Sequence, residues 1–333
     1  MIWRRLVVRA MWGAAISLAV LGGGAFALDR VADLREARAE AEFPPLGQFI
    51  EVEGRSIHAF VRGAGPDLVL IHGAGGNLRD WTLGILPELA KHFRVIAFDR
   101  PGLGWSDRAP GYGDSAFSTR AETPREQARI LQAAADQLNV KNPLVMGHSF
   151  GGSVALAWGL ERPENTAALV VLSGASNPWQ GSLATTYTLF GSALGGAFVV
   201  PFVTSFASDE QIVNTLHGIF DPQPQPRAYA RQLGAALTLR RDVMRTNARQ
   251  VRGLKSALKS MVPDYPNLPM PVEIIHGTAD TVVPFDVHAA KLINQIPNAT
   301  LTPLDGQGHM PHHTSPDAVV QATLRAAQRA GLH

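Results

Sequence analysis

The sequence of 333 residues contains no cysteine. That absence excludes disulfide scaffolds, thiolate zinc sites, iron–sulfur clusters and a cysteine nucleophile. Charged residues are also few, at 17% of the chain, and 30 Lys and Arg nearly balance 28 Asp and Glu. The net charge of +2 is too small for a general nucleic-acid surface. What remains is a hydrophobic content of 46%, which is too high for a disordered chain.

Residues 1–28 have the pattern of a membrane anchor or a signal peptide. Three arginines lie among the first nine residues, and the run Ala10–Leu28 then contains no charged residue. Because a helix needs about 20 apolar residues to cross a bilayer, the run favours an uncleaved anchor. A small-residue motif ending at Ala27 would suit signal cleavage instead. Either alternative predicts that the rest of the chain is periplasmic or extracellular, anchored in the first case and secreted in the second.

The remaining chain divides into a stalk, a core and an insertion. Asp29–Glu42 is rich in Ala, Glu and Arg, which predicts an exposed helical stalk that a Phe-Pro-Pro sequence ends. After the stalk, short apolar strands alternate with helical stretches, which predicts a doubly wound α/β sheet. We therefore predict the following ranges: stalk or linker 29–46, core 47–176 and 266–333, and helical cap 177–265.

The expected strands are short runs rich in Val, Ile and Leu, as in parallel strands covered on both faces. They are Gln48–Val52 and Ser56–Arg62, which form a hairpin, then Asp67–Ile71, Arg94–Phe98, Leu144–Met146, Ala168–Leu172, Val272–Ile275 and Thr300–Leu304. Helices are expected over Arg125–Asn139 and Phe150–Glu161.

The cap carries a basic amphipathic helix and several aromatic side chains. Six basic residues recur at helical spacing beside an apolar stripe, which predicts a solvated basic face; contact with anionic lipid or an acidic substrate is the sharper alternative. These residues are Arg241, Arg245, Arg249, Arg252, Lys255 and Lys259. Four aromatic residues are expected either to line an apolar acyl pocket or to form the cap core: Trp179, Tyr187, Phe190 and Phe198.

A nucleophile motif is present at Gly147-His148-Ser149-Phe150-Gly151, between an apolar strand and a helix-like stretch. A serine on a sharp strand-to-helix turn needs small neighbours and gains unpaired N–H groups from the helix start. The context predicts that Ser149 is a nucleophile, although an ordinary Gly-rich turn would have the same sequence.

A serine nucleophile needs a base and an acid, in the chain order Ser, acid, His for this topology. His309 follows the last predicted strand, and Asp280 follows the preceding one. We therefore predict that His309 is the general base and that Asp280 orients it. Asp305, close to His309 in the chain, is the weaker alternative acid.

The sequence His72-Gly73-Ala74-Gly75-Gly76 follows a strand and lacks the pattern of a phosphate-binding loop. Its backbone N–H groups suit an oxyanion hole. We predict that Ala74 and Phe150 donate the two N–H groups, with Gly75 as an open alternative to Ala74.

These motifs together resemble the α/β-hydrolase superfamily over residues 47–333. The resemblance rests on HGAGG at 72–76, DRPGLGWSD at 99–107, GHSFGG at 147–152, HGTAD at 276–280 and GQGH at 306–309. It implies an eight-stranded, mostly parallel sheet with a helical cap between strands six and seven. Relatives that use an aspartate nucleophile are excluded because position 149 is serine.

Histidines near the expected site raise the question of a metal. His309, His312 and His313 cluster in the sequence, but no matching set of carboxylates is evident there, so we predict no metal site. His72 and His148 are expected to pack or to form hydrogen bonds. No cofactor is expected.

The sequence thus predicts a serine hydrolase that cleaves a carboxylic ester or lactone through an acyl-enzyme, with a small-molecule ester or lipid-like substrate. The resemblance leaves acyl transfer, perhydrolysis and carbon–carbon bond hydrolysis open as alternatives. A third possibility is a non-catalytic, anchored binding protein. Loss of a triad residue would favour it, but Ser149, Asp280 and His309 are all present. The expected partners are this substrate and a membrane, which the N-terminal segment would contact; nucleic acid is excluded, and the oligomeric state is left open.

Overall fold

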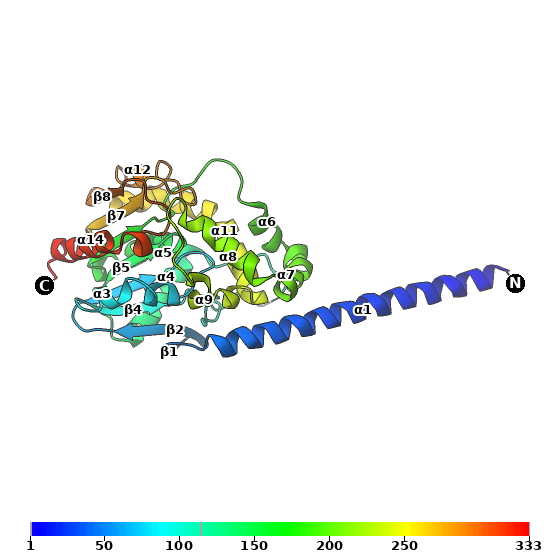
Figure 1. The fold of residues 1–333 in the computed structure, drawn as a ribbon. Helices are drawn as coiled ribbons and strands as arrows, with labels where there is room; N and C mark the ends of the chain where they lie inside the picture. The colour runs from blue at the N-terminus through cyan, green and yellow to red at the C-terminus, as the bar shows by residue number, and fades with distance from the viewer. Residues whose placement is uncertain (1, 114, 333) are drawn as a thin grey trace.

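The computed structural model describes residues 2–113 and 115–332, except for the side chains of residues 2, 4–10, 13–21 and 209. Within the described residues an eight-stranded sheet runs through the centre of the body, in the order β1-β2-β4-β3-β5-β6-β7-β8 (Figure 1). The strands are β1 (Gln48–Val52), β2 (Arg55–Arg62), β3 (Asp67–Ile71), β4 (Arg94–Phe98), β5 (Leu144–His148), β6 (Ala168–Leu172), β7 (Val272–Gly277) and β8 (Ala299–Leu304).

The sheet is antiparallel at one edge and parallel elsewhere. β1 and β2 form the predicted hairpin, β2 pairs antiparallel with β4, and the remaining neighbours are parallel. In register, Val69 of β3 lies between Ile96 of β4 and Val145 of β5. The predicted eight-stranded, mostly parallel α/β fold is therefore confirmed, and every strand lies within a few residues of its expected position.

Side chains of the central strands alternate between two apolar cores, as a pleated strand requires. Val69 and Ile71 belong to the core on one face, which α4 (Pro124–Gln137) and α5 (Phe150–Glu161) cover. Leu68 and Leu70 belong to the core on the other face. That face is covered by α2 (Arg79–Thr82), α3 (Leu86–Leu89) and α14 (Pro316–Arg329). Burial on both faces explains why the strands are almost wholly apolar.

Helices fill the chain between β6 and β7, in the range where the sequence predicts a cap. They are α6 (Thr185–Phe190), η2 (Gly195–Val199), α7 (Val200–Phe206), α8 (Asp209–His217), η3 (Gly218–Phe220), α9 (Tyr229–Leu233), α10 (Ala235–Thr238), α11 (Arg241–Met261) and η4 (Val262–Asn267). The shorter elements η1 (Pro163–Asn165), α12 (Ala289–Leu292) and α13 (Pro311–Thr314) connect parts of the core.

The first helix, α1 (Ile2–Glu42), is continuous through the predicted leader and stalk and extends away from the body (Figure 1). Its C-terminal part, Asp29–Glu42, is helical as predicted, but it is not exposed on every side. Ala32 and Ala39 are buried, because the helix packs on α7 and α10 of the cap. The Ser205 hydroxyl donates to the Leu28 carbonyl at 3.0 Å, and the Arg35 guanidinium donates to the Ser205 carbonyl at 3.0 Å.

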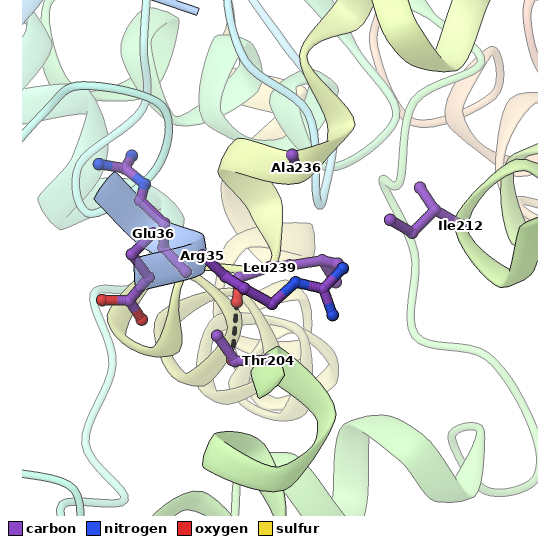
Figure 2. A pocket seen from close by; sticks show the side chains of 7 residues that line it. Arg35, Glu36, Thr204, Ile212, Ala236 and Leu239 are labelled. Carbon is purple, nitrogen blue, oxygen red and sulfur yellow. Dashed lines mark hydrogen bonds between the residues drawn. The ribbon is translucent and has the colours of Figure 1, made fainter. Parts of the chain in front are cut away.

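Charged side chains complete this junction between α1 and the cap. The Arg241 guanidinium, 15% exposed, pairs with Asp29, Asp33 and Glu36, and its Nε lies 2.8 Å from a Glu36 carboxylate oxygen. These carboxylates raise the pKa of Arg241 far above its ordinary value, chiefly through the Glu36 hydrogen bond. A cavity of about 40 Å³ lies between α1 and the cap, and Figure 2 shows Arg35 and Glu36 among the side chains that line it.

The predicted solvated basic face of α11 is therefore wrong in its first half. Arg241 is held by α1, while Arg245 and Arg249 are buried. Arg245 donates to the Gly196 carbonyl at 2.7 Å, and Arg249 donates to the Ala116 carbonyl at 3.0 Å. A lipid contact through these three arginines is likewise ruled out, because their guanidinium groups are engaged inside the protein.

The predicted anchor, residues 1–28, includes many side chains that lie outside those described. Among the helices of the described residues, none has an apolar stretch long enough to span a bilayer.

Candidate active site

The turn between β5 and α5 presents Ser149. Its backbone has φ 55° and ψ −120°, a strained conformation for a residue with a Cβ. The Ser149 N–H donates to the Leu172 carbonyl of β6 at 3.0 Å, which fixes the turn to the sheet. A Cβ at Gly147 would lie 2.0 Å from the Gly151 carbonyl oxygen, so the motif needs glycine there. Ser149 is thus held at the end of a central strand, with the start of α5 beside it.

His309 and Asp280 meet at the neighbouring strand ends. His309 Nδ1 lies 2.7 Å from Asp280 Oδ2, and both side chains are buried. The other carboxylate oxygen, Oδ1, accepts the N–H groups of Val282 and Val283 at 2.9 and 2.8 Å. Two fixed N–H donors and an imidazole therefore hold the carboxylate in one orientation. His309 Nε2 is left as the nitrogen that can exchange a proton with a substrate or a nucleophile.

The electrostatics around Asp280 keep it ionised. Burial acts to raise its pKa, but the charge of His309 and hydrogen bonds from His276 and His309 hold the pKa well below the ordinary value. His276 was not singled out from the sequence as part of this site; its Nε2 lies 3.2 Å from Asp280 Oδ2 and 2.7 Å from the Val283 carbonyl oxygen. Asp305, the alternative acid, is instead exposed and accepts from the Thr278 hydroxyl at 3.2 Å.

The loop after β3 passes directly beside Ser149. A Cβ built on Gly73 would stand 3.0 Å from Ser149 Cβ and 3.5 Å from Ser149 Oγ. Phe150 is the first residue of α5, so its N–H has no acceptor within the helix. The Gly75 N–H, the open alternative, donates to Asn247 Oδ1 at 2.7 Å and is already engaged. The arrangement therefore favours Ala74 with Phe150 as the pair of oxyanion donors.

A sequence profile of the alpha/beta hydrolase family matches residues 68–322, a range that contains Ser149, Asp280, His309 and the loop after β3. The chain belongs to the alpha/beta hydrolase family. The predicted membership is thus confirmed, and with it the hydrolase fold.

Among relatives of this hydrolase, an uncharacterized protein of Mycobacterium tuberculosis is 28% identical over 89% of this chain and 85% of its own. A 2-hydroxymuconate semialdehyde hydrolase of a Pseudomonas species is 29% identical over 80% of this chain and 88% of its own. Among solved structures, a membrane phospholipase A, described as a bacterial virulence factor, has a TM-score of 0.63 at 20% identity. The comparison covers 97% of this chain and 98% of the phospholipase.

The cap of the hydrolase holds the loop that carries Ala74. Asn247 of α11 accepts the Gly75 N–H, and the hydroxyl of Thr238, the last residue of α10, donates to the Gly75 carbonyl at 2.7 Å. The backbone N–H and the carbonyl of Gly75 are thus both paired with cap side chains. Neither contact was predicted, because the partners are separated by 163 and 172 residues in the sequence.

Arg100, which follows β4, also forms a hydrogen bond with the loop that carries Ala74. It is fully buried and donates to the Gly73 carbonyl at 3.0 Å, and its guanidinium carbon lies 4.2 Å from the centre of the Phe150 ring. Its backbone N–H donates to His72 Nε2 at 3.0 Å. Burial, with the nearby Arg100 charge, lowers the pKa of His72 to about 4, so that the imidazole remains neutral. The expectation of a hydrogen-bonding role for His72 agrees with this geometry.

A second buried group of polar side chains lies next to His309. His148 Nε2 lies 2.9 Å from the His309 carbonyl oxygen. Asp80 accepts from His312 at 3.0 Å, from His313 at 2.8 Å and from the Tyr229 hydroxyl at 2.7 Å. Asp80 is the carboxylate that the sequence did not place near these histidines, since it lies 232 residues from His312.

The ligand atoms of Asp80, His148 and His312 lie within 4.8 Å of one another, a grouping that a metal ion can use. Within the described residues, however, both Asp80 oxygens already accept hydrogen bonds. Burial holds the pKa of His148 well below its ordinary value and lowers that of His312 to about 4. The two neutral rings lie close together, with centroids 4.5 Å apart and planes tilted by 55°. The expectation of no metal stays a prediction.

The four aromatic residues predicted to line an acyl pocket or form the cap core have different environments. Trp179 and Tyr187 pack against the core of the hydrolase, and Phe190 is half-buried. Phe198 is 64% exposed, so neither expectation holds for it.

Proposed function

We propose that the protein is a serine hydrolase that cleaves carboxylic esters through an acyl-enzyme. The observation that carries the proposal is the 2.7 Å contact between His309 Nδ1 and Asp280, at the strand ends beside the strained Ser149 turn. The contact fixes the tautomer and the orientation of a base whose other nitrogen is free for catalysis.

In the first half of the reaction, the Ser149 hydroxyl attacks the ester carbonyl carbon while His309 Nε2 takes its proton. The carbonyl oxygen becomes an oxyanion, which the Ala74 and Phe150 N–H groups stabilise. When the intermediate collapses, the bond to the alkoxy oxygen breaks. His309 then gives its proton to that oxygen, and the alcohol leaves the acyl-enzyme.

In the second half, a water molecule attacks the acyl carbon and His309 takes one of its protons. The second tetrahedral intermediate releases the carboxylic acid, and the proton returns to Ser149 Oγ. Asp280 remains a carboxylate throughout and stabilises the charged imidazole, in agreement with its lowered pKa.

We propose further that the substrate is lipid-like and that residues 1–28 anchor the enzyme with its catalytic domain on the non-cytoplasmic side. The uncharged run Ala10–Leu28 supports this proposal. The similarity to a membrane phospholipase A extends over 97% of this chain, which is more than the catalytic domain alone.

Hydrolysis of a carbon–carbon bond is a second candidate for the same triad. It is favoured by the relative that acts as a 2-hydroxymuconate semialdehyde hydrolase. The tests of substrate class therefore compare p-nitrophenyl esters of increasing chain length with 2-hydroxymuconate semialdehyde.

We expect the ester kcat/KM to rise with chain length, and the semialdehyde to turn over slowly or not at all. The Ser149→Ala variant is the matched control for both reactions. Efficient turnover of the semialdehyde with negligible ester hydrolysis would contradict the ester proposal and support the second candidate. Labelling of Ser149 by a fluorophosphonate without turnover of either substrate class would point to acyl transfer.

A further inference from the structure

The cap displays an unusual set of exposed apolar side chains. Leu194 directly precedes η2, and Phe198, Phe202 and Phe206 follow at four-residue steps through η2 and α7. The four residues therefore share one face of a continuous helical segment. Their exposed fractions are 69%, 64%, 57% and 59%. We call these four residues the apolar cap face.

The rings of this surface lie close to one another. The Phe202 and Phe206 centroids are 4.9 Å apart, and Phe198 meets the half-exposed Phe117 at 6.0 Å. Single exposed apolar residues are ordinary, whereas a cluster of exposed rings marks a binding surface.

The chain around the apolar cap face carries no charge. The sequence from residue 165 to residue 208 contains no Asp, Glu, Lys or Arg. A protein surface in contact only with water normally carries charged side chains among its apolar ones. Arg35 and Arg252 reach the ends of this segment from other helices, but the segment itself adds no charged side chain that would have to be placed against lipid.

The position of α1 indicates what covers the face. α7 packs on α1, and Ser205, the neighbour of Phe206, donates to the Leu28 carbonyl at 3.0 Å. Leu28 is the last residue of the uncharged run Ala10–Leu28. In Figure 1 the helix continues from this junction away from the sheet, toward the side where α7 lies.

We propose that the apolar cap face rests in the interfacial region of the same bilayer that receives the N-terminal run of α1. The inference rests on the anchored location proposed above. The exposed rings and α1 would form one continuous apolar surface, with the aromatic rings at the depth that such side chains favour. The cap would then take its substrate directly from the lipid surface.

The absence of cysteine makes the proposal directly testable, because one introduced cysteine is the only labelling site. Full-length Leu194→Cys and Phe202→Cys variants are labelled with an environment-sensitive fluorophore and placed in phosphatidylcholine nanodiscs. The matched control is Lys91→Cys, at a 62% exposed side chain two residues after the end of α3. Lipids with a quencher on the acyl chain then report contact with the bilayer.

The proposal predicts blue-shifted emission and loss of fluorescence with quencher lipids at positions 194 and 202, and neither effect at position 91. Equal, water-like emission at all three positions overturns it. A third outcome is blue-shifted emission at 194 and 202 that quencher lipids do not reduce and that disappears on dilution. This result would identify a second copy of the chain as the cover of the face, and it also overturns the proposal.

Reaction of Ser149 with a fluorophosphonate in the same samples separates this proposal from the proposed function. If Ser149 reacts normally but the labels at 194 and 202 emit as in water, only the lipid contact is refuted. If lipid quenchers reduce the emission of these labels but Ser149 does not react, only the hydrolase mechanism is refuted. If the full-length chain fails to float with vesicles in a density gradient, the anchored location fails, and the lipid contact fails with it.

Discussion

Replacing Asn247 with Ala removes the cap side chain that holds the Gly75 N–H. The acceptor lies 2.7 Å from that nitrogen, and Gly75 follows the proposed oxyanion donor Ala74 directly. The change leaves Ser149, His309 and Asp280 untouched. It therefore tests whether the cap positions the oxyanion loop, separately from the chemistry of the triad.

The structure sets the expected size of the effect. Leaving a partly buried N–H without its acceptor costs about 1–3 kcal/mol, and each 1.4 kcal/mol that appears in the barrier lowers the rate about tenfold. Because the loop acts on the oxyanion, which exists only after attack, the loss should appear in kcat more than in KM. We expect kcat to fall roughly 10- to 100-fold, below the effect of removing an oxyanion donor outright.

The assay is hydrolysis of a short-chain p-nitrophenyl ester, with thermal unfolding measured on the same preparation. Thr238→Val removes the hydroxyl that donates to the Gly75 carbonyl and should lower kcat in the same way. Thr238→Ser keeps that hydroxyl and serves as the matched control, with kcat near wild type. If Asn247→Ala folds normally and keeps kcat within about twofold of wild type, the cap does not position the loop.

Three further perturbations follow from the described contacts. Asp280→Asn should preserve folding but lower kcat about 10³- to 10⁴-fold, because an amide favours the wrong tautomer of the histidine; an unchanged kcat would exclude Asp280 from the triad. Arg241→Gln should lower the melting temperature by a few degrees in low salt and by less in high salt; an equal loss in both would argue against ion pairing with α1. Burial lowers the pKa of His72, His288 and His312 to about 4. The unfolded chain therefore binds more protons than the folded chain below about pH 6.5. As a result, the free energy of unfolding should fall by about 2 kcal/mol per histidine between pH 7.5 and pH 5. A urea unfolding midpoint that is the same at both pH values would refute this.

Local patterns in the sequence were sufficient to predict the strands, and they also placed the three proposed catalytic residues after strands. A run such as Ala168–Leu172 is apolar because both faces are covered, and it forms β6 at the predicted residues. Ser149, Asp280 and His309 each follow a strand, so the topology of a parallel sheet brings them to one edge. In the structure His309 Nδ1 lies 2.7 Å from Asp280 Oδ2, as the chain order of the motifs predicts.

Contacts between distant segments could not be predicted in this way. Helical periodicity identified the basic residues of α11, but it carries no information about which other segments meet them. Arg241 meets the acidic side of α1, and Arg249 meets the carbonyl groups of Ser115 and Ala116. The same limit applies to Asn247, whose hydrogen bond to Gly75 depends on how the cap packs over the core.

The central claim is that Ser149 is a nucleophile activated by His309. The most direct measurement is covalent labelling of the full-length protein by a fluorophosphonate, followed by identification of the modified peptide. The account predicts one label on Ser149, slowed strongly in His309→Ala and absent in Ser149→Ala. An unlabelled wild type, or equal labelling of wild type and Ser149→Ala, would contradict it.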